Sequence, residues 1–331
     1  MRLKRRAFLK SAGLTLVGAG LSHPSQAASQ PFQERGIFSL TGHKAQWCHP
    51  QIQRPTNVFF VSDTHLWNSD EREQPFSKYS GRMANAYHET RHFQTGDKTS
   101  PQEAFSATLK QAKAKGADLL ILGGDIFSYP SEAAIEWALA QLADTAIPFV
   151  YTAGNHDWHY EGMPGSLAGL RHTWTDERLR PLYQHGDPLM STTDINGIRF
   201  LVLDNSTNEI LPEQLAFFRQ SVHTDMPVVL AMHIPLYVPG RSLGFGCGHP
   251  DWNAANDRNF EIERRERWPI QGHTATTMDF HREVFSASNI IGIIAGHIHT
   301  PSIDVWNGIP QLVAPYNAAG GHLQLAFVSK T

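Results

Sequence analysis

Short apolar runs, each followed by polar side chains, recur along the chain. Five of them are rich in β-branched and large aliphatic residues and predict buried strands: 58–61, 119–122, 149–151, 228–231 and 290–294. The carboxyl ends of strands are where α/β sheets place their ligand sites. The polar residues that follow these runs are therefore the first candidates for function.

Helical periodicity alternates with the strands. Apolar residues at three- and four-residue spacing predict helices over 101–115, over 134–142 after Ser131, and over 212–222, where a proline stands in the first turn. Further strands are predicted at 198–203 and 228–232, and three more at 303–306, 311–313 and 323–328 suit closing antiparallel strands. No internal repeat interrupts this mixed α/β pattern.

The polar segments after the strands carry metal-binding residue types. In chain order they are Asp63-Thr64-His65, Gly123-Gly124-Asp125, Gly154-Asn155-His156-Asp157, His233 and Gly296-His297-Ile298-His299. Carboxylates, imidazoles and one amide oxygen suit Mn, Fe, Zn or Co better than a thiolate metal or calcium. Two such ions about 3.5–4 Å apart are a recurring device for displacement at phosphorus. Hydrolysis of a phosphoester is therefore the predicted reaction.

The order and spelling of these segments resemble the calcineurin-like metallophosphoesterase superfamily, whose pattern runs D-x-H, G-D, G-N-H-D/E, H and G-H-x-H. The resemblance extends from Asp63 to His299. It implies a four-layer α/β/β/α sandwich of two mixed β-sheets flanked by helices, in a single domain over residues 28–331. It also implies two divalent metal ions.

The resemblance assigns a role to each residue. One metal would be held by Asp63, His65, Asp125 and His299, and the second would share Asp125 and add Asn155, His233 and His297. A metal-bound hydroxide would be the nucleophile. His156 would stand near the leaving-group oxygen as general acid or electrostatic stabiliser, with Asp157 orienting its ring.

Simpler interpretations exist for single residues. A histidine such as His233 in an apolar run is more often packed in a core than bound to a metal. Asp63 or Asp125 alone could cap a helix that follows a strand. The presence of all five segments in one order favours the metal site.

The N-terminal segment predicts export. Basic residues at 4–6 and Lys10 precede a short apolar stretch over 12–21, and Ser25-Gln26-Ala27 offers a cleavage site before Ala28. Residues 1–27 look like a twin-arginine signal peptide, which implies passage through the twin-arginine export machinery to a bacterial periplasm or to the exterior. The apolar stretch is too short to span a bilayer, so no transmembrane segment is expected. The alternative is a basic, solvated arm.

Composition limits the partners. Cleavage after residue 27 would remove five basic and no acidic residues and take the formal net charge from −3 to −8. An acidic chain is not expected to carry a general nucleic-acid surface, which requires a basic patch. The two cysteines, Cys48 and Cys247, are too few for a disulfide framework, and the sequence leaves open whether they pair.

Two long segments are expected to determine substrate choice. The first insertion, at about 66–100, is polar and aromatic, and includes Arg82, Tyr87 and Arg91. The second, at about 237–289, opens with a glycine-rich run over 240–248 that could fold over the metals, where Arg241 could grip a phosphate. His249 and His273 are expected to be ordinary loop histidines.

Three functions fit these observations. The first is an exported phosphoesterase that hydrolyses a small phosphomonoester or phosphodiester. The second is a nuclease, which the acidic chain disfavours. The third is a non-catalytic metal-binding or interaction module, against which His156 and Asp157 argue because neither is needed to hold metal.

Overall fold

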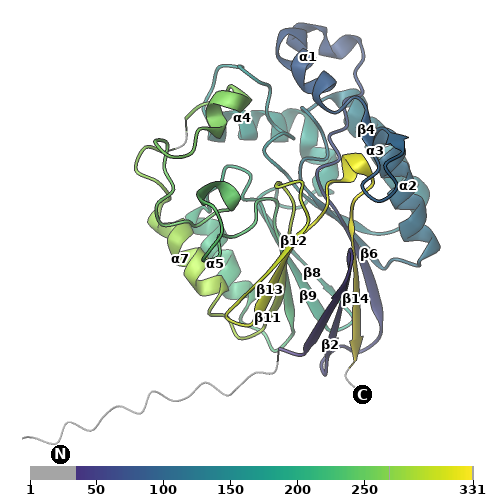
Figure 1. Cartoon of the computed structure of the whole chain (residues 1–331), viewed down its shortest axis with the longest axis vertical. Helices are drawn as coiled ribbons and strands as arrows, with labels where there is room; N and C mark the ends of the chain where they lie inside the picture. Colours follow the sequence, from purple (N-terminus) through teal and green to yellow (C-terminus); the bar gives the residue numbers. More distant parts are fainter. Residues whose placement is uncertain (1–34, 268, 330–331) are drawn as a thin grey trace, which may run out of the picture. The chain divides into compact units, whose positions relative to one another are not determined.

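The computed structural model describes residues 35–267 and 269–329, and within this range two six-stranded sheets form the centre of the molecule (Figure 1). The first sheet has the order β1 (Ile37–Thr41), β2 (Lys44–His49), β14 (Leu323–Ser329), β3 (Thr56–Val61), β6 (Leu119–Gly123) and β7 (Phe149–Thr152). The second has the order β12 (Ser302–Trp306), β13 (Ile309–Val313), β11 (Ile290–Ala295), β10 (Val228–Ala231), β9 (Ile198–Leu203) and β8 (Met190–Ile195). Residues 1–27, the predicted signal peptide, lie outside the described residues.

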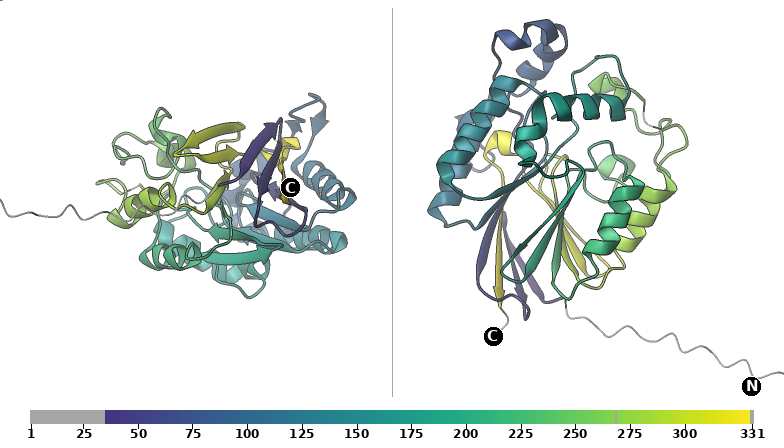
Figure 2. Two further views of the ribbon diagram at one scale, coloured as in Figure 1. Left: turned by 90° about the horizontal axis from the view of Figure 1, so that it is seen from below. Right: turned by 180° about the vertical axis from the view of Figure 1, so that it is seen from behind.

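Helices cover the outer face of each sheet (Figure 2). Against the first sheet lie α2 (Pro101–Ala114) and α3 (Glu132–Thr145), and against the second lie α5 (Pro212–Ser221) and α7 (Ala275–Val284). The shorter helices are α1 (Ser77–Ala86), α4 (Leu167–Trp174), α6 (Asn259–Glu263), η1 (Glu71–Phe76), η2 (Thr175–Leu179), η3 (Arg180–Tyr183), η4 (Leu243–Phe245) and η5 (Asn317–Ala319). The predicted four-layer α/β/β/α sandwich is confirmed.

Both faces of the central strands are buried, which explains their unbroken apolar runs. In β3, Phe59 and Val61 pack beneath α2 and α3, whereas Val58 and Phe60 point into the space between the sheets. The indole Nε1 of Trp47 crosses that space and donates a hydrogen bond to the carbonyl oxygen of Ile291, at 2.8 Å. The two sheets are thereby fixed face to face.

Three outer helices, α2, α3 and α5, lie where the sequence predicts them. The side chains of Ser100 and Ser131 accept hydrogen bonds from backbone N–H groups in the first turns of α2 and α3, and Pro212 opens α5. The strands β1, β2 and β8 were not predicted. Their exposed and buried positions are mixed, and they supply few consecutive apolar residues.

The C-terminal strands differ from the prediction. Of the three expected closing antiparallel strands, β12 does pair antiparallel with β13, but β13 runs parallel to β11. β14 crosses to the first sheet, where it lies between β2, to which it is parallel, and β3, to which it is antiparallel. Strand direction depends on distant partners, which a local apolar pattern does not encode.

Both predicted insertions contain regular structure. Residues 66–100 hold η1, α1 and a small two-stranded sheet of β4 (Thr90–Arg91) and β5 (Lys98–Thr99). In the second insertion, residues 275–284 form α7, whose Phe280 and Val284 are buried against the second sheet. This helix belongs to the outer layer of the sandwich, so the segment that departs from the sandwich ends before Ala275.

His322 predicts a loss of stability in acid. Its ring is buried and stacked on Phe59, and burial lowers its pKa to about 4, with the charge of His43 acting in the same direction and the Gly320 carbonyl opposing it. The unfolded chain would take up this proton near pH 6.5, so the stabilisation is present above that value and lost as the pH falls from about 6.5 to 4, by roughly 2–3 kcal/mol.

Replacing His322 with phenylalanine keeps the stack on Phe59 and removes the titration. The His322→Phe variant should unfold near the parent's urea midpoint at pH 7, and at a higher midpoint than the parent at pH 4.5. If the urea midpoints of both proteins fell by the same amount between pH 7 and pH 4.5, groups other than His322 would be responsible for the loss of stability in acid.

Within the described residues, no helix has both the length and the apolar character needed to cross a bilayer. Cys48, in β2, and Cys247, which is buried, are both free thiols.

Candidate metal centre

Two groups of metal-binding side chains gather where the two sheets meet their loops. The first group follows β3 and β11, and the second follows β6, β10 and β11. Within each, the ligand atoms lie within 4.8 Å of one another: Asp63, His65 and His299 in the first, and Asp125, His233 and His297 in the second. Two distant sequence segments therefore supply the first group, and three supply the second.

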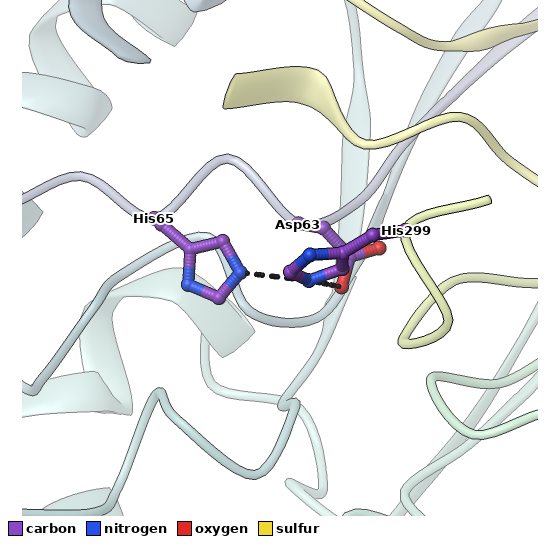
Figure 3. Close-up of side chains that lie close together, drawn as sticks. All are labelled: Asp63, His65 and His299. Carbon is purple, nitrogen blue, oxygen red and sulfur yellow. Dashed lines mark hydrogen bonds and ion pairs between the residues drawn. The ribbon is translucent and has the colours of Figure 1, made fainter. Parts of the chain in front are cut away.

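In the first group, two imidazoles and a carboxylate converge (Figure 3). Nε2 of His65 lies 3.1 Å from Nε2 of His299, which in turn lies 3.3 Å from Oδ1 of Asp63. Both oxygens of Asp63 accept hydrogen bonds from the backbone N–H of His297, at 3.0 Å. The loop after β11 thus fixes the orientation of the carboxylate.

In the second group, hydrogen bonding selects the tautomer of His233. Its Nδ1 donates to the carbonyl oxygen of Gly123 at 2.9 Å, which leaves Nε2 facing Oδ2 of Asp125 at 3.2 Å. A histidine that donates from one ring nitrogen presents the other as a ligand atom. Oδ1 of Asp125 accepts a hydrogen bond from the backbone N–H of His156, at 2.8 Å.

Asn155 stands beside the second group. It lines the same cleft as Asp125 and His297, and its Oδ1 is buried without a hydrogen-bond partner. Buried polar atoms normally have partners, so an orphaned oxygen beside carboxylates and imidazoles is a position that fits a cation. The residues present therefore fit a pair of divalent metal ions.

The charges of the centre are strongly coupled. Burial alone would raise the pKa of Asp63, but a hydrogen bond with His299 and the charges of His299 and His233 lower it to about 2. Burial likewise opposes the charged form of His233, but Asp125 and Asp63 raise its pKa to about 10. Without metal, the buried carboxylates thus depend on protonated imidazoles for charge balance.

The backbone at the centre is held in an unusual conformation. Five of the predicted ligands have positive φ, between 51° and 68°: Asp63, His65, Asp125, His297 and His299. Non-glycine residues seldom adopt this region, and such strain concentrates at functional sites. Gly124, with φ of 87°, is also required here, because a Cβ at that position would lie 2.6 Å from Nδ1 of His233.

Asp157 does not take the predicted role. Its Oδ1 accepts a hydrogen bond from the N–H of Phe127 and its Oδ2 from the N–H of Gly154, both at 2.8 Å. Nδ1 of His156 is buried without a hydrogen bond. Asp157 therefore joins the loops after β6 and β7, and the prediction that it orients the ring of His156 is wrong. The error arises because adjacency to His156 in the sequence does not reveal that backbone N–H groups of two loops bind both oxygens of this carboxylate.

The pKa of Asp157 reflects this buried position. Burial raises it, the charge of Asp125 adds to the effect, and the two backbone hydrogen bonds oppose it, so that the pKa of Asp157 stands at about 7. Because both of its oxygens accept backbone hydrogen bonds, Asp157 is a positioning residue for the loops that carry Asp125 and Asn155.

A cleft of about 380 Å³ lies over both groups. His156 lines it together with Asp125, His297 and His299, and α1 of the first insertion forms one wall. The ring of Tyr87 stacks on His65 with 3.9 Å between ring centroids, and that of Tyr316 stacks on His299 with 5.2 Å. Aromatic rings thus hold both imidazoles of the first group in place.

Of the arginines in the two insertions, Arg241 was expected to grip a phosphate, and this expectation needs correction. Arg241 does not line the cleft, because its Nε is bound to both carboxylate oxygens of Asp304 at 2.9 and 3.0 Å, and its guanidinium lies over Phe245. Arg91 binds the carbonyl oxygen of Gly96 on an exposed surface. Arg82 does line the cleft, but it forms a two-point ion pair with Glu161, in which Nε lies 2.6 Å from Oε2.

Sequence reasoning missed Glu161, Tyr316, Asn208 and Asn259, all of which line the cleft or adjoin it. Only Glu161 had a signal in the sequence, since it follows the Gly154–Asp157 segment closely.

The glycine-rich run of the second insertion does fold toward the metal centre, because Gly244 lines the cleft. His273 was expected to be an ordinary loop histidine, but its ring joins two segments. Nδ1 lies 3.1 Å from Oε1 of Glu209, and Nε2 accepts a hydrogen bond from the N–H of Gly248.

Comparison with known proteins decides the family. The family model for calcineurin-like phosphoesterases matches residues 56–301, which contain all of the predicted metal ligands. The chain belongs to this family. As a calcineurin-like phosphoesterase, it is a phosphoric ester hydrolase.

The chain is also similar to individual proteins. A "Probable cyclic nucleotide phosphodiesterase" of Moraxella catarrhalis is 36% identical to this calcineurin-like phosphoesterase over 217 residues, which are 62% of this chain and 67% of the relative. Among solved structures, a dimetal phosphatase from Danio rerio has a TM-score of 0.48 at 11% identity, covering 80% of this chain and 88% of its own. A purple acid phosphatase from yellow lupin has a TM-score of 0.47 at 13% identity, covering 85% and 47%.

Proposed function

We propose that this calcineurin-like phosphoesterase is a dinuclear-metal phosphodiesterase whose substrate is a small cyclic nucleotide. Asp63, His65, Asp125 and His299 would hold one ion, and Asn155, His233 and His297 would hold the second together with Asp125. The observation that carries the proposal is the cleft. Residues of both metal groups line it, and Glu161 neutralises the arginine that lines it.

The charge of the cleft favours a diester. A phosphomonoester carries nearly two negative charges and a phosphodiester one, so a monoester site gains more from cationic side chains beyond the metals. Arg82 is the arginine that lines this cleft, and the carboxylate of Glu161 occupies two of its N–H groups. The similarity to a probable cyclic nucleotide phosphodiesterase supports the same choice.

Each residue type has a defined task in the proposed reaction. Bound divalent ions polarise phosphoryl oxygens and lower the pKa of water. Asp63 and Asp125 supply the negative charge that retains the ions, and Tyr87 holds the ring of His65. Nδ1 of His156 is buried, so we assign proton donation toward the leaving-group oxygen to its Nε2.

The test compares a matched pair of substrates. Residues 28–331, supplied in turn with Mn, Fe, Zn and Co, should hydrolyse bis-(4-nitrophenyl) phosphate at a higher kcat/KM than 4-nitrophenyl phosphate, and should also hydrolyse adenosine 3′,5′-cyclic phosphate. Preference for the monoester would contradict the proposal. So would inertness toward all three substrates with two metal ions bound per chain.

Glu161→Gln should shift this preference toward the monoester. The substitution removes the carboxylate that neutralises Arg82. The guanidinium then offers a positive charge to the second negative charge of a phosphomonoester. We expect the monoester-to-diester ratio of kcat/KM to rise about tenfold, which corresponds to about 1.4 kcal/mol. Glu213→Gln, at an exposed position of α5, is the control and should leave the ratio unchanged. An unaltered ratio in Glu161→Gln would show that Arg82 does not reach the substrate.

We also propose that the protein is exported through the twin-arginine route and acts in a bacterial periplasm or outside the cell. The support is the basic, apolar and small-residue order of residues 1–27. Recovery of the exported protein with Met1 at its N-terminus would contradict cleavage after Ala27.

A further inference from the structure

A small polar recess adjoins the candidate metal centre. It lies beside His297 and Asn155, beneath the run that includes Gly244, and Asn208 and Asn259 line it. Its volume is about 20 Å³. That is room for one water-sized group, such as a hydroxyl. Gly244 and Asn259 also line the main cleft, so the recess and the cleft share a border.

Asn208 is the unusual member of this recess. Its side chain is buried, with 6% of the residue exposed, and its Oδ1 has no hydrogen-bond partner. Leaving a buried acceptor unsatisfied costs on the order of 1–3 kcal/mol. The residue also adopts φ of 59°, a left-handed conformation. Asparagine readily adopts this conformation, so the turn explains the residue type but not the unpartnered Oδ1.

The backbone around Asn208 holds this amide in place. Its N–H donates to the carbonyl oxygen of Asn205 at 2.7 Å, and its own carbonyl accepts from Sγ of Cys247 at 3.4 Å. The neighbouring carboxylate of Asp257 is already occupied, because it accepts hydrogen bonds from Nε1 of Trp252 and from the N–H of Asn259. Arg265 also lines the recess, yet no donor among the described residues bonds Oδ1 of Asn208, so this acceptor is open to a donor of a ligand.

We propose that this recess is a substrate subsite in which Oδ1 of Asn208 accepts a hydrogen bond from a hydroxyl group of the substrate. The inference rests on the proposed phosphodiesterase function. In a ribonucleoside 3′,5′-cyclic phosphate the 2′-hydroxyl is on the carbon next to the one that bears the 3′ ester oxygen. It is the donor nearest to the reacting phosphorus, and the recess borders the metal ligands Asn155 and His297. Asn208 is thus assigned to the choice of ribose over deoxyribose.

The test compares adenosine 3′,5′-cyclic phosphate with its 2′-deoxy analogue. The metal-loaded protein should prefer the ribose form by about ten- to a hundredfold in kcat/KM, because the deoxy analogue leaves the buried oxygen unsatisfied. Asn208→Gly removes the carboxamide yet tolerates positive φ, and should reduce the preference to about one. Asn208→Asp keeps an acceptor and should retain most of it.

Asn307→Gly is the matched control. Asn307 also has positive φ, of 50°, but lies in the turn between β12 and β13, at the end of β13 remote from the metal loops. The Asn307→Gly variant should show the same preference in kcat/KM for the ribose form over the 2′-deoxy form as the unaltered protein. A second readout is the affinity for the mononucleotides adenosine 5′-phosphate and its 2′-deoxy form, measured by calorimetry with metal content checked. Asn208→Gly should abolish the difference between them without loss of metal.

The outcomes separate the two proposals. Equal hydrolysis of both cyclic nucleotides by the unaltered protein, with equal affinity for both mononucleotides, would overturn the subsite and leave the phosphodiesterase function standing; the recess would then hold a structural water only. A ribose preference that survives Asn208→Gly would also overturn it. Hydrolysis of neither cyclic nucleotide would overturn both proposals.

Discussion

Asp125→Asn is expected to remove most of the bound metal and nearly all turnover. Asparagine keeps the shape of the side chain, and its Oδ1 can still accept from the N–H of His156, but it lacks the charge that faces Nε2 of His233. Two ions that share this carboxylate would both lose an anionic ligand. Loss of several kcal/mol of charge stabilisation predicts a fall in kcat/KM of at least about a thousandfold.

Elemental analysis of the purified variant, alongside rates on bis-(4-nitrophenyl) phosphate, measures both effects. Asp279→Asn is the control, since Asp279 is an exposed partner of Arg282 on α7. It should bind metal and turn over normally. Two ions per chain with normal turnover in Asp125→Asn would refute the shared carboxylate.

His156→Ala is expected to keep the metals and lose the rate. The side chain lines the cleft, and the ring packs edge-on against His65 with 5.0 Å between centroids, but His156 belongs to neither group of converging ligand atoms. Removing a general acid or base lowers the rate by about two to four orders of magnitude. We therefore expect an unchanged metal content and a kcat reduced on that scale.

The choice of leaving group sharpens this prediction. A substrate with a poor leaving group should suffer more from His156→Ala than an aryl ester, because its departing oxygen depends more on protonation. His172→Ala, an exposed position on α4, serves as the control. Loss of metal from His156→Ala would make this residue a ligand, and an unaffected rate would remove it from the mechanism.

How far the sequence predicted the molecule can be judged from particular residues. The strand ends that carry Asp63, Asp125 and His233 were predicted because both faces of β3, β6 and β10 are buried, which produces continuous apolar runs. The helix that begins at Pro101 was predicted from the spacing of its apolar residues, and the next one from the same spacing after Ser131. Those signals lie within a few residues of the element that they define.

The failures share a different cause. The crossing of β14 to the first sheet, the pairing of Arg241 with Asp304 and the bond from the N–H of Phe127 to Asp157 all depend on residues from 30 to more than 200 positions away. Such contacts are decided by the packing of the whole fold. The metal-binding residues and the type of reaction could thus be predicted from the sequence motifs. The side chains that shape the cleft could not.

The position of β14 has a consequence for biosynthesis. Among the strands that the structure describes, β14 is translated last, yet it stands between β2 and β3 in the middle of the first sheet. Just before it, the N–H groups of Asn317 and Ala318 bind the carbonyl oxygens of Ser62 and Asp63. Until β14 has been synthesised, β2 and β3 lack the strand that joins them, and the loop of Asp63 lacks its support. Loading of metal should therefore follow the synthesis and insertion of β14.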